Sequence, residues 1–257
     1  MIIGAQLFTL RDFCKTTQDL DETLKKVADM GIKTVQLSGV CAYDPAWMAE
    51  RLTEFGLTAD ITHFDINRIA NETEATLKFH QTMNCRYIGI GCMPAEHMRP
   101  FTEEKLTAFF DRVRPAAKYF AQNGSKFMYH THHFEFAMLE GKNVLTRMLE
   151  EFPNPDEYGI TFDVWWAQYT GENPVKWLYA LEGRTDCVHF KDMSHNANGD
   201  IIMVPNGDGI MDYDAIIKAC VDTGVKYGYI EQDNCNGEDP FACMKRSYEF
   251  FKSRGLN

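Results

Sequence analysis

The chain has 257 residues, of which 45% are hydrophobic and 25% charged, and its formal net charge at pH 7 is −11. This composition is typical of a globular protein with a sizeable core, and it excludes a disordered or fibrous chain. The acidic balance, without a run of basic residues, also argues against nucleic acid and anionic lipid as partners.

Short apolar runs that recur along the chain predict β-strands. Most of them are continuously apolar rather than alternating, as expected for strands buried on both faces of a parallel sheet. Eight such runs occur, at Ile2–Leu7, Thr34–Leu37, Thr58–Thr62, Tyr87–Gly91, Lys126–His130, Gly159–Phe162, Cys187–Phe190 and Tyr227–Glu231.

Amphipathic stretches between these runs predict helices. Several carry start and stop signals, such as Gly31 after the first stretch, and Pro45 near the start and Gly56 just past the end of the second. The predicted helices cover Leu20–Met30, Pro45–Phe55, Glu103–Gln122, Lys142–Glu151, Pro174–Leu181, Tyr213–Thr223 and Asp239–Lys252.

Strands that alternate with helices predict one parallel sheet. With eight strands, closure into a (β/α)8 barrel is the simplest arrangement, and an open doubly wound sheet is the alternative. No G-x-G-x-x-G motif follows the first strand to support that alternative, and no linker-like segment divides the chain. We therefore predict an α/β protein with a single TIM barrel domain over residues 1–257, whose active site lies at the C-terminal ends of the strands.

Cysteine use and hydropathy indicate the compartment. The chain has eight cysteines, none of them in a C-x-x-C pair, and a chain of this length needs no disulfides to be stable. We therefore expect reduced thiols and a cytoplasmic protein. The first residues lack the features of a signal peptide, and no stretch of about 18 apolar residues occurs, so we expect no membrane association.

The last four predicted strands end on side chains that can bind a metal ion. His130, Asp163, His189 and Glu231 stand at or near successive strand ends. In a closed barrel these ends converge, and a mixed set of nitrogen and oxygen ligands suits Mn²⁺, Mg²⁺, Co²⁺ or Zn²⁺. Each residue alone has another interpretation, because Asp163 can cap the following turn, His189 can be a core histidine and Glu231 can pair with a lysine. Their joint placement favours one divalent metal ion as cofactor.

These strand ends also resemble a known family. Asp163, the segment VHFKD around His189 and the segment YIEQD around Glu231 are similar to motifs of the xylose-isomerase-like superfamily, which contains sugar isomerases, epimerases and inosose dehydratases. Further similar segments are GAQLFTLR from Gly4, FDVWW from Phe162, GENP from Gly171 and PNGDGIMD from Pro205. The resemblance runs along the whole chain.

The resemblance implies a (β/α)8 barrel with one divalent metal ion, held by Glu, Asp, His and Glu from the last four strands. It also implies assembly into homo-oligomers. Asp163, His189 and Glu231 match three of these ligands, and His130 stands where the family has its first Glu. His130 is therefore the expected fourth ligand, and the family's mechanism with two metal-bound glutamates does not carry over unchanged.

Three residues are the expected catalytic groups. Glu231 is the expected proton acceptor, and His132 is expected to take over the acid or base role of the missing glutamate, with Glu135 as the alternative. Lys191 follows His189 by two residues, so both side chains lie on one face of the strand. Lys191 is expected to bind a hydroxyl, carboxylate or phosphate group of the substrate.

Further residues are expected to contact the substrate. Gln6 and Gln36 end or line the first two strands, and His63 follows the third. Trp166 is expected to form part of an aromatic wall for a sugar face, with core packing as the alternative. Glu135 completes this predicted substrate-binding set.

The resemblance favours a metal-dependent isomerase or epimerase that transfers a proton through an enediolate of a ketose or related polyol. Loss of a hydroxyl or glycosidic oxygen instead would make the protein a dehydratase or lyase acting on an inosose or keto-sugar. A nuclease of the endonuclease IV type needs three metals and a basic face, which the acidic charge disfavours, and a non-catalytic sugar-binding barrel is a third hypothesis. The acidic loop Asn206–Gly209 argues against phosphate binding and so favours an unphosphorylated substrate.

Overall fold

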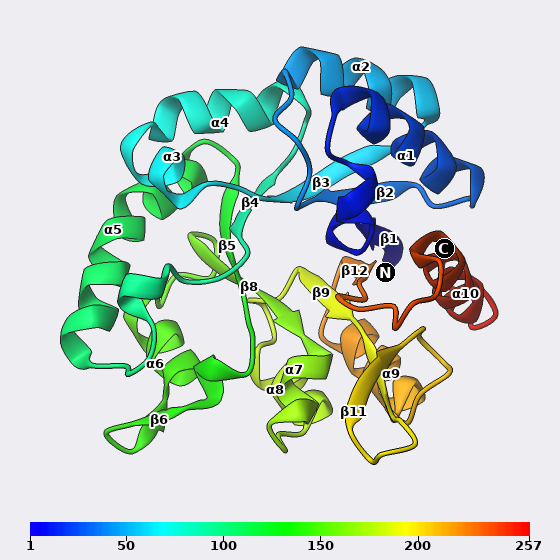
Figure 1. Ribbon diagram of the computed structural model, residues 1–257. Helices are drawn as coiled ribbons and strands as arrows, with labels where there is room; N and C mark the ends of the chain where they lie inside the picture. Colours follow the sequence, from blue (N-terminus) through cyan, green and yellow to red (C-terminus); the bar gives the residue numbers. More distant parts are fainter.

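The eight apolar runs form one closed barrel in the computed structural model, which describes residues 1–257 (Figure 1). Neighbouring barrel strands are parallel, and the first strand closes the ring by pairing with the last, where Ala5 lies opposite Ile230. The barrel strands are β1 (Ile2–Gln6), β2 (Thr34–Leu37), β3 (Thr58–His63), β4 (Tyr87–Ile90), β5 (Lys126–His130), β8 (Tyr158–Asp163), β9 (Cys187–Phe190) and β12 (Tyr227–Ile230). The predicted (β/α)8 barrel is confirmed.

Helices surround the barrel (Figure 1). Local caps set several of their ends: Thr16 and Asp19 form a capping box before α1, while Asp44 caps the start of α2 and Gly56 ends it with a φ of 64°. The helices are α1 (Thr17–Asp29), α2 (Pro45–Phe55), α3 (Ile66–Asn71), α4 (Thr73–Thr82), α5 (Glu103–Gln122), α6 (Val144–Glu151), α7 (Val164–Tyr169), α8 (Pro174–Ala180), α9 (Tyr213–Asp222) and α10 (Pro240–Lys252).

The structure contains elements that the sequence pattern does not predict. The helices α3 and α4 lie between β3 and β4, where no helix is expected, because α3 is only six residues long and α4 buries the polar side chains of Thr76 and His80. Short elements also follow β1, β5 and β9, at the end of the barrel where the active site is expected. They are the 3-10 helix Leu7–Phe13, the hairpin of β6 (Met138–Leu139) with β7 (Lys142–Asn143), and the hairpin of β10 (Asp192–His195) with β11 (Ile201–Val204).

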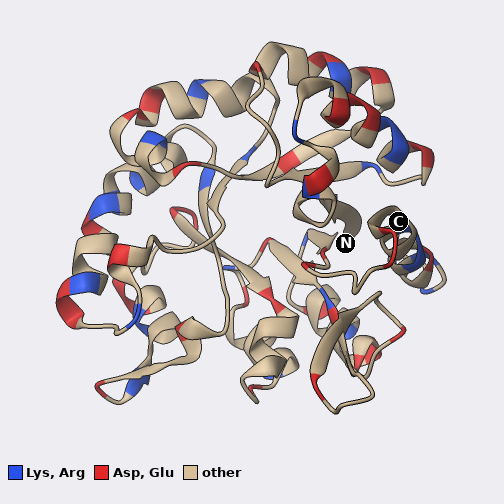
Figure 2. Cartoon of the chain, in the orientation of Figure 1, with Lys and Arg blue, Asp and Glu red and all other residues tan.

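One continuous hydrophobic core of 58 buried residues joins the barrel to its helices, as in a single-domain barrel. A second cluster of five buried residues comes from five different strands: Ile61, Tyr87, Met128, Cys187 and Tyr229. Acidic and basic residues are interspersed along the outer helices (Figure 2). None of the helices combines the length and the apolar composition that crossing a bilayer requires.

Candidate metal centre and pocket

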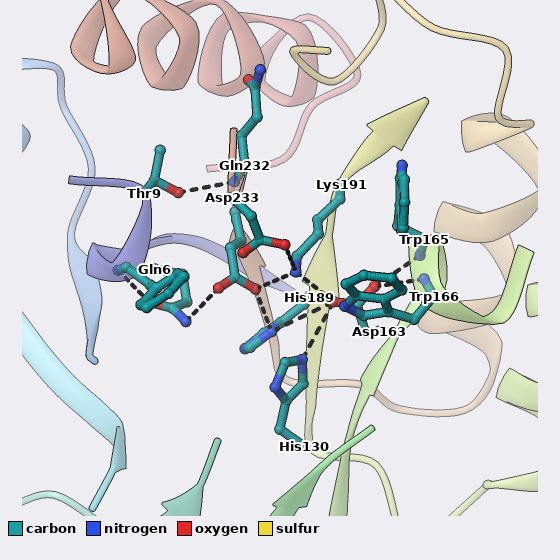
Figure 3. Close-up of polar contacts among 12 residues, drawn as sticks. Gln6, Thr9, His130, Asp163, Trp165, Trp166, His189, Lys191, Gln232 and Asp233 are labelled. Carbon is teal, nitrogen blue, oxygen red and sulfur yellow. Dashed lines mark hydrogen bonds and ion pairs between the residues drawn. The ribbon is translucent and has the colours of Figure 1, made fainter. Parts of the chain in front are cut away.

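Barrel closure brings the four predicted metal ligands together. His130 ends β5, Asp163 ends β8, His189 lies in β9 and Glu231 follows β12, and these four strands are consecutive neighbours in the ring. One ligand atom from each residue lies within 4.8 Å of all the others, and all four side chains are buried. Figure 3 shows His130, Asp163 and His189 pointing toward one another.

Each histidine is anchored by the ring nitrogen that faces away from the cluster. Nδ1 of His130 donates to the carbonyl oxygen of Gly91 at 2.9 Å, so a neutral ring turns its Nε2 lone pair toward Oδ2 of Asp163, 3.3 Å away. Nε2 of His189 donates to Oε1 of Gln36 at 2.6 Å, which turns the Nδ1 lone pair toward Oε2 of Glu231, 2.8 Å away. An anchored outer N–H of this kind fixes the tautomer that binds a metal ion.

These contacts place hydrogen-bond acceptors against each other. Nδ1 of His189 and Oε2 of Glu231 are both buried and have no hydrogen-bond partner. Protonation does not relieve the contact at His130, because burial and the neighbouring histidines hold the pKa of His130 well below its ordinary value. Two imidazole nitrogens and two carboxylate oxygens around one point therefore fit a divalent cation of the Zn²⁺, Mn²⁺ or Co²⁺ type.

The carboxylate of Asp163 has one oxygen in a helix cap and the other at the cluster. Oδ1 of Asp163 accepts the backbone N–H groups of Trp165 and Trp166 at 2.9 and 3.0 Å and so caps α7, while Oδ2 faces the cluster. Turn capping and metal binding are thus compatible at Asp163. Burial raises the pKa of Asp163 to about 6, against the opposing effect of Lys191.

Glu231 is held ionised by its neighbours. Its Oε1 accepts a hydrogen bond from Nε2 of Gln6 at 2.7 Å, and its Oε2 faces His189 and Lys191. Burial alone would raise the pKa of Glu231, but the positive charge of Lys191 holds it well below its ordinary value. The carboxylate is therefore ionised at neutral pH and can bind a cation.

A buried lysine lies beside the cluster (Figure 3). Nζ of Lys191 is 3.1 Å from Oδ2 of Asp163, 3.0 Å from Oε2 of Glu231 and 2.8 Å from Oδ2 of Asp233. Burial opposes its charge, yet these three carboxylates raise the pKa of Lys191 above its ordinary value. Asp233 is not among the site residues predicted from the sequence. Its spacing of two residues from Glu231 is the signal that could have identified it, because side chains two positions apart in an extended chain share one face.

A pocket opens beside the cluster, with a volume of about 250 Å³. Its lining includes His132, His63 and Gln6 from the predicted catalytic and substrate-binding residues. His63 is held by a 2.9 Å hydrogen bond between its Nδ1 and Oγ of Ser38. The full lining is Gln6, Phe8, Ser38, Gly39, His63, Gly91, Cys92, His130, His132, Lys191, Glu231 and Asp233.

Three of the predicted substrate contacts lie outside this lining. Gln36 is fully buried, and its Oε1 accepts a hydrogen bond from His189. Trp166 stands at its margin, with its ring centre 5.7 Å from that of His132 and 5.6 Å from Nζ of Lys191. Glu135 is fully buried, and its carboxylate accepts hydrogen bonds from the hydroxyl of Tyr129 and, at 2.8 Å, from the backbone N–H of His132. Glu135 therefore supports the loop that carries His132 instead of facing the pocket.

Comparison with known proteins gives the chain a family. The family model for the xylose isomerase-like TIM barrel matches residues 15–252. An inosose dehydratase of Geobacillus kaustophilus is 22% identical over 196 residues, which are 68% of this chain and 63% of the dehydratase, so the match spans less than two thirds of that relative.

Solved structures of low sequence identity share the fold. A sugar phosphate isomerase/epimerase from Parabacteroides distasonis superposes with a TM-score of 0.83 at 17% identity, covering 98% of this chain and 93% of that one. An L-ribulose 3-epimerase superposes with a TM-score of 0.75 at 13% identity, covering 98% and 94%. The match of the family model along nearly the whole chain shows that the protein belongs to the xylose isomerase-like TIM barrel family.

Proposed function

We propose that the protein is a divalent-metal-dependent isomerase or epimerase that moves a proton at the carbon beside a carbonyl group of a small sugar or polyol. Two contacts carry this proposal, that of His130 with Asp163 and that of His189 with Glu231. In each of them two hydrogen-bond acceptors face one another, and a cation bound between them would remove the repulsion. The pocket beside this cluster gives a substrate access to the same groups. The epimerase and dehydratase names of the compared proteins agree with carbon-acid chemistry of this class.

The proposed reaction assigns roles to four of the residues that line the pocket. A divalent ion held by the four ligands would supply Lewis acidity, which polarises a carbonyl oxygen and acidifies the neighbouring C–H bond. Glu231 is ionised and accepts that proton, and Glu231 or the neutral imidazole of His132 exchanges it with the product. Gln6 orients the carboxylate of Glu231, and His63 contacts a substrate hydroxyl.

A second reaction, dehydration, is favoured by one particular observation. An imidazole, His130, occupies the strand end from which the family supplies a second glutamate, so that Glu231 is the one glutamate of the predicted ligand set. In this second reaction Glu231 removes the proton from carbon and passes it to the departing β-hydroxyl on the same face, so that a C=C bond and one water molecule form. The protein would then be a dehydratase or lyase acting on an inosose or keto-sugar.

Metal analysis of the purified chain tests the proposal first. We expect about one Mn, Co, Mg or Zn ion for each wild-type chain, and its loss in both His189→Ala and Glu231→Gln. His195→Ala and Glu249→Gln are matched controls, because both residues are exposed and lie outside the cluster, and they should keep the metal. A wild-type chain that stays metal-free after incubation with Mn²⁺ would point to a non-catalytic sugar-binding barrel instead.

Deuterium exchange then separates the two reactions. The metal-loaded chain is incubated in D₂O with a panel of ketoses and inososes. Isomerisation or epimerisation incorporates deuterium at carbon without loss of water, whereas dehydration lowers the product mass by one water molecule. Absence of both signals in a metal-loaded protein across the panel would contradict an enzyme of this class.

A further inference from the structure

The charges around the pocket constrain the substrate that the proposed function leaves open. Three lining side chains carry a formal charge at neutral pH: Lys191, Glu231 and Asp233. Asp163 lies directly behind them and contacts the same lysine at 3.1 Å. Three carboxylates therefore face one ammonium group, and a bound divalent cation would bring the local sum to about zero.

The charge of Lys191 is already neutralised by carboxylates of the protein. Three carboxylate oxygens lie 2.8 to 3.1 Å from Nζ, and one of them, Oδ2 of Asp233, accepts a hydrogen bond from it. The side chain is also only 1% exposed. A phosphate group that approached Lys191 would have to displace a carboxylate and would meet the negative charge of Asp233 on the same side of the pocket.

Arg11, on the 3-10 helix after β1, is also committed. Its Nη1 donates to the carbonyl oxygen of Phe8 at 2.8 Å, and its Nη2 donates to the carbonyl oxygen of Asp233 at 2.9 Å. The guanidinium group lies over the ring of Phe8, with the ring centre 4.3 Å from Cζ. This cation stabilises the pocket wall from behind and does not line the pocket.

One cluster of backbone amides outside the pocket lining, which could otherwise bind an anion, is occupied by a side chain of the protein itself. The carboxylate of Asp192 accepts the N–H groups of Met193, Gly207, Gly209 and Met211 at 2.8 to 3.2 Å. A Cβ atom built on Gly209 would lie 2.2 Å from Oδ1 of Asp192, so the loop closes tightly on this carboxylate. A cluster of N–H groups that often binds phosphate is thus used to tie down the loop after β11.

The uncommitted groups of the pocket suit hydroxyls instead. Nε2 of His63 and Nδ1 of His132 are buried without a hydrogen-bond partner, and both residues line the pocket. A hydroxyl group can donate to a ring nitrogen or accept from it, whichever tautomer is present. The volume of about 250 Å³ is below the roughly 300–1,000 Å³ of sites for drug-sized ligands, so it suits a monosaccharide or cyclitol.

We propose that this pocket takes an uncharged keto-sugar or keto-cyclitol and selects against phosphorylated and carboxylated forms of the same molecule. The proposal rests on the proposed function for the place where the substrate binds. It assigns the selection to Asp233, which lines the pocket and helps to neutralise Lys191.

Calorimetric binding to the Mn²⁺-loaded full chain tests this selection. The probes are D-fructose and 2-keto-myo-inositol as uncharged ligands, and D-fructose 6-phosphate as the charged partner of the first. We expect millimolar or tighter binding of at least one uncharged probe, and binding of the ester that is weaker than that of D-fructose by about tenfold or more. Equal or tighter binding of the ester, or no binding of either uncharged probe, would overturn the proposal.

The Asp233→Asn variant tests the assigned cause. Removal of this charge leaves Lys191 with one fewer carboxylate, so the affinity for the ester relative to the free sugar should rise by about fivefold. Asp111→Asn is the matched control, because Asp111 is exposed on α5 and makes the same change in net charge. An unchanged ratio in Asp233→Asn would overturn the role of Asp233.

Metal content, measured on the same samples, separates this inference from the proposed function. A metal-loaded chain that prefers the ester contradicts the charge selection alone. A chain that cannot be loaded with metal but still prefers the uncharged probes contradicts the proposed chemistry and supports the selection.

Discussion

Gln36 shows how a single side chain outside the ligand set governs the cluster. It is fully buried in β2, and its Oε1 holds Nε2–H of His189, which leaves Nδ1 of His189 available to a cation. Without this acceptor, the ring can rotate or adopt the other tautomer. The ligand would remain in place, but its lone pair would no longer be fixed toward Glu231.

We expect Gln36→Leu to weaken metal binding by about 10- to 100-fold, because an outer-shell partner of a histidine ligand orients the ring. Competition with a chromophoric chelator gives the dissociation constant. Gln36→Glu keeps an acceptor oxygen and should restore most of the affinity. If the leucine variant binds metal as tightly as the wild type, the packing around His189 is sufficient to orient the ring and Gln36 has no such role.

Lys191 is the residue whose removal should have the opposite effect. Its ammonium group shares Oδ2 of Asp163 and Oε2 of Glu231 with the proposed metal position. A unit charge about 4 Å away contributes up to about 4 kcal/mol at an effective dielectric constant of 20, so the lysine opposes a second cation there. We expect Lys191→Met to bind the metal ion about tenfold or more tightly.

The same chelator competition measures this change, and Lys218→Met is the control because Lys218 is exposed and pairs with Asp222 on α9. Weaker metal binding by Lys191→Met would mean that the lysine holds the carboxylates in position for the metal instead of competing with it. Activity should fall in either case, because Lys191 lines the pocket.

At the scale of elements, the buried carboxylate of Glu135 holds the loop after β5 in place. Burial raises the pKa of Glu135 from 4.5 to about 7, although its hydrogen bonds with Tyr129 and the backbone of His132 act in the other direction. The folded state therefore holds this proton more strongly than the unfolded state does. The resulting stabilisation is fully present below about pH 4.5 and is lost as the pH rises through about 7.

We expect Glu135→Gln to remove this pH dependence. The free energy of unfolding of the wild type, relative to the variant, should fall by up to about 3 kcal/mol between pH 4.5 and 8, since one pKa unit corresponds to about 1.4 kcal/mol. Urea denaturation at a series of pH values measures it. Glu104→Gln, at an exposed position of α5, should follow the wild-type profile. Parallel profiles for the wild type and Glu135→Gln would contradict the raised pKa.

The elements differ in how accurately the sequence predicts them. The strands β2, β5 and β9 have the predicted bounds, because each is a short apolar run whose edges the pattern marks. The helices α3 and α4 escape prediction, because Glu72 joins them without a side-chain cap and because buried Thr76 and His80 interrupt the apolar face. The ring nitrogens of His80 form hydrogen bonds with the hydroxyl of Thr62 and the carbonyl oxygen of Thr76. The bond with Thr62 joins residues of different elements, so the local pattern does not reveal it.

At the scale of the whole molecule, ring closure links metal binding to folding. The four ligands come from strands spread over residues 126–231, and they meet only when the barrel is closed. A metal ion that binds this arrangement, and not the unfolded chain, stabilises the fold by about 2.7 kcal/mol at a free concentration 100 times its dissociation constant.

We expect chelation to lower the melting temperature of the metal-loaded chain by about 5 to 10 °C, because 1 kcal/mol shifts the midpoint of a domain of this size by about 2 to 4 °C. Calorimetric scans before chelation, after chelation and after return of the metal measure the shift. His189→Ala should show no shift. A wild-type midpoint that is insensitive to both treatments would argue against a metal that binds through these four strands.

The sequence alone determines the strand-and-helix alternation, the barrel and the residue types at its strand ends. These depend on local periodicity and on residues close together in the chain, as with Asp163 after β8 and Lys191 two positions after His189. The tertiary structure alone decides which atoms face one another. Gln36 meets His189 across 153 positions and Gln6 meets Glu231 across 225, because barrel closure and strand register set these pairs. The inward burial of Glu135 has the same origin, since it depends on Tyr129 and the packed loop and not on a repeat in the sequence.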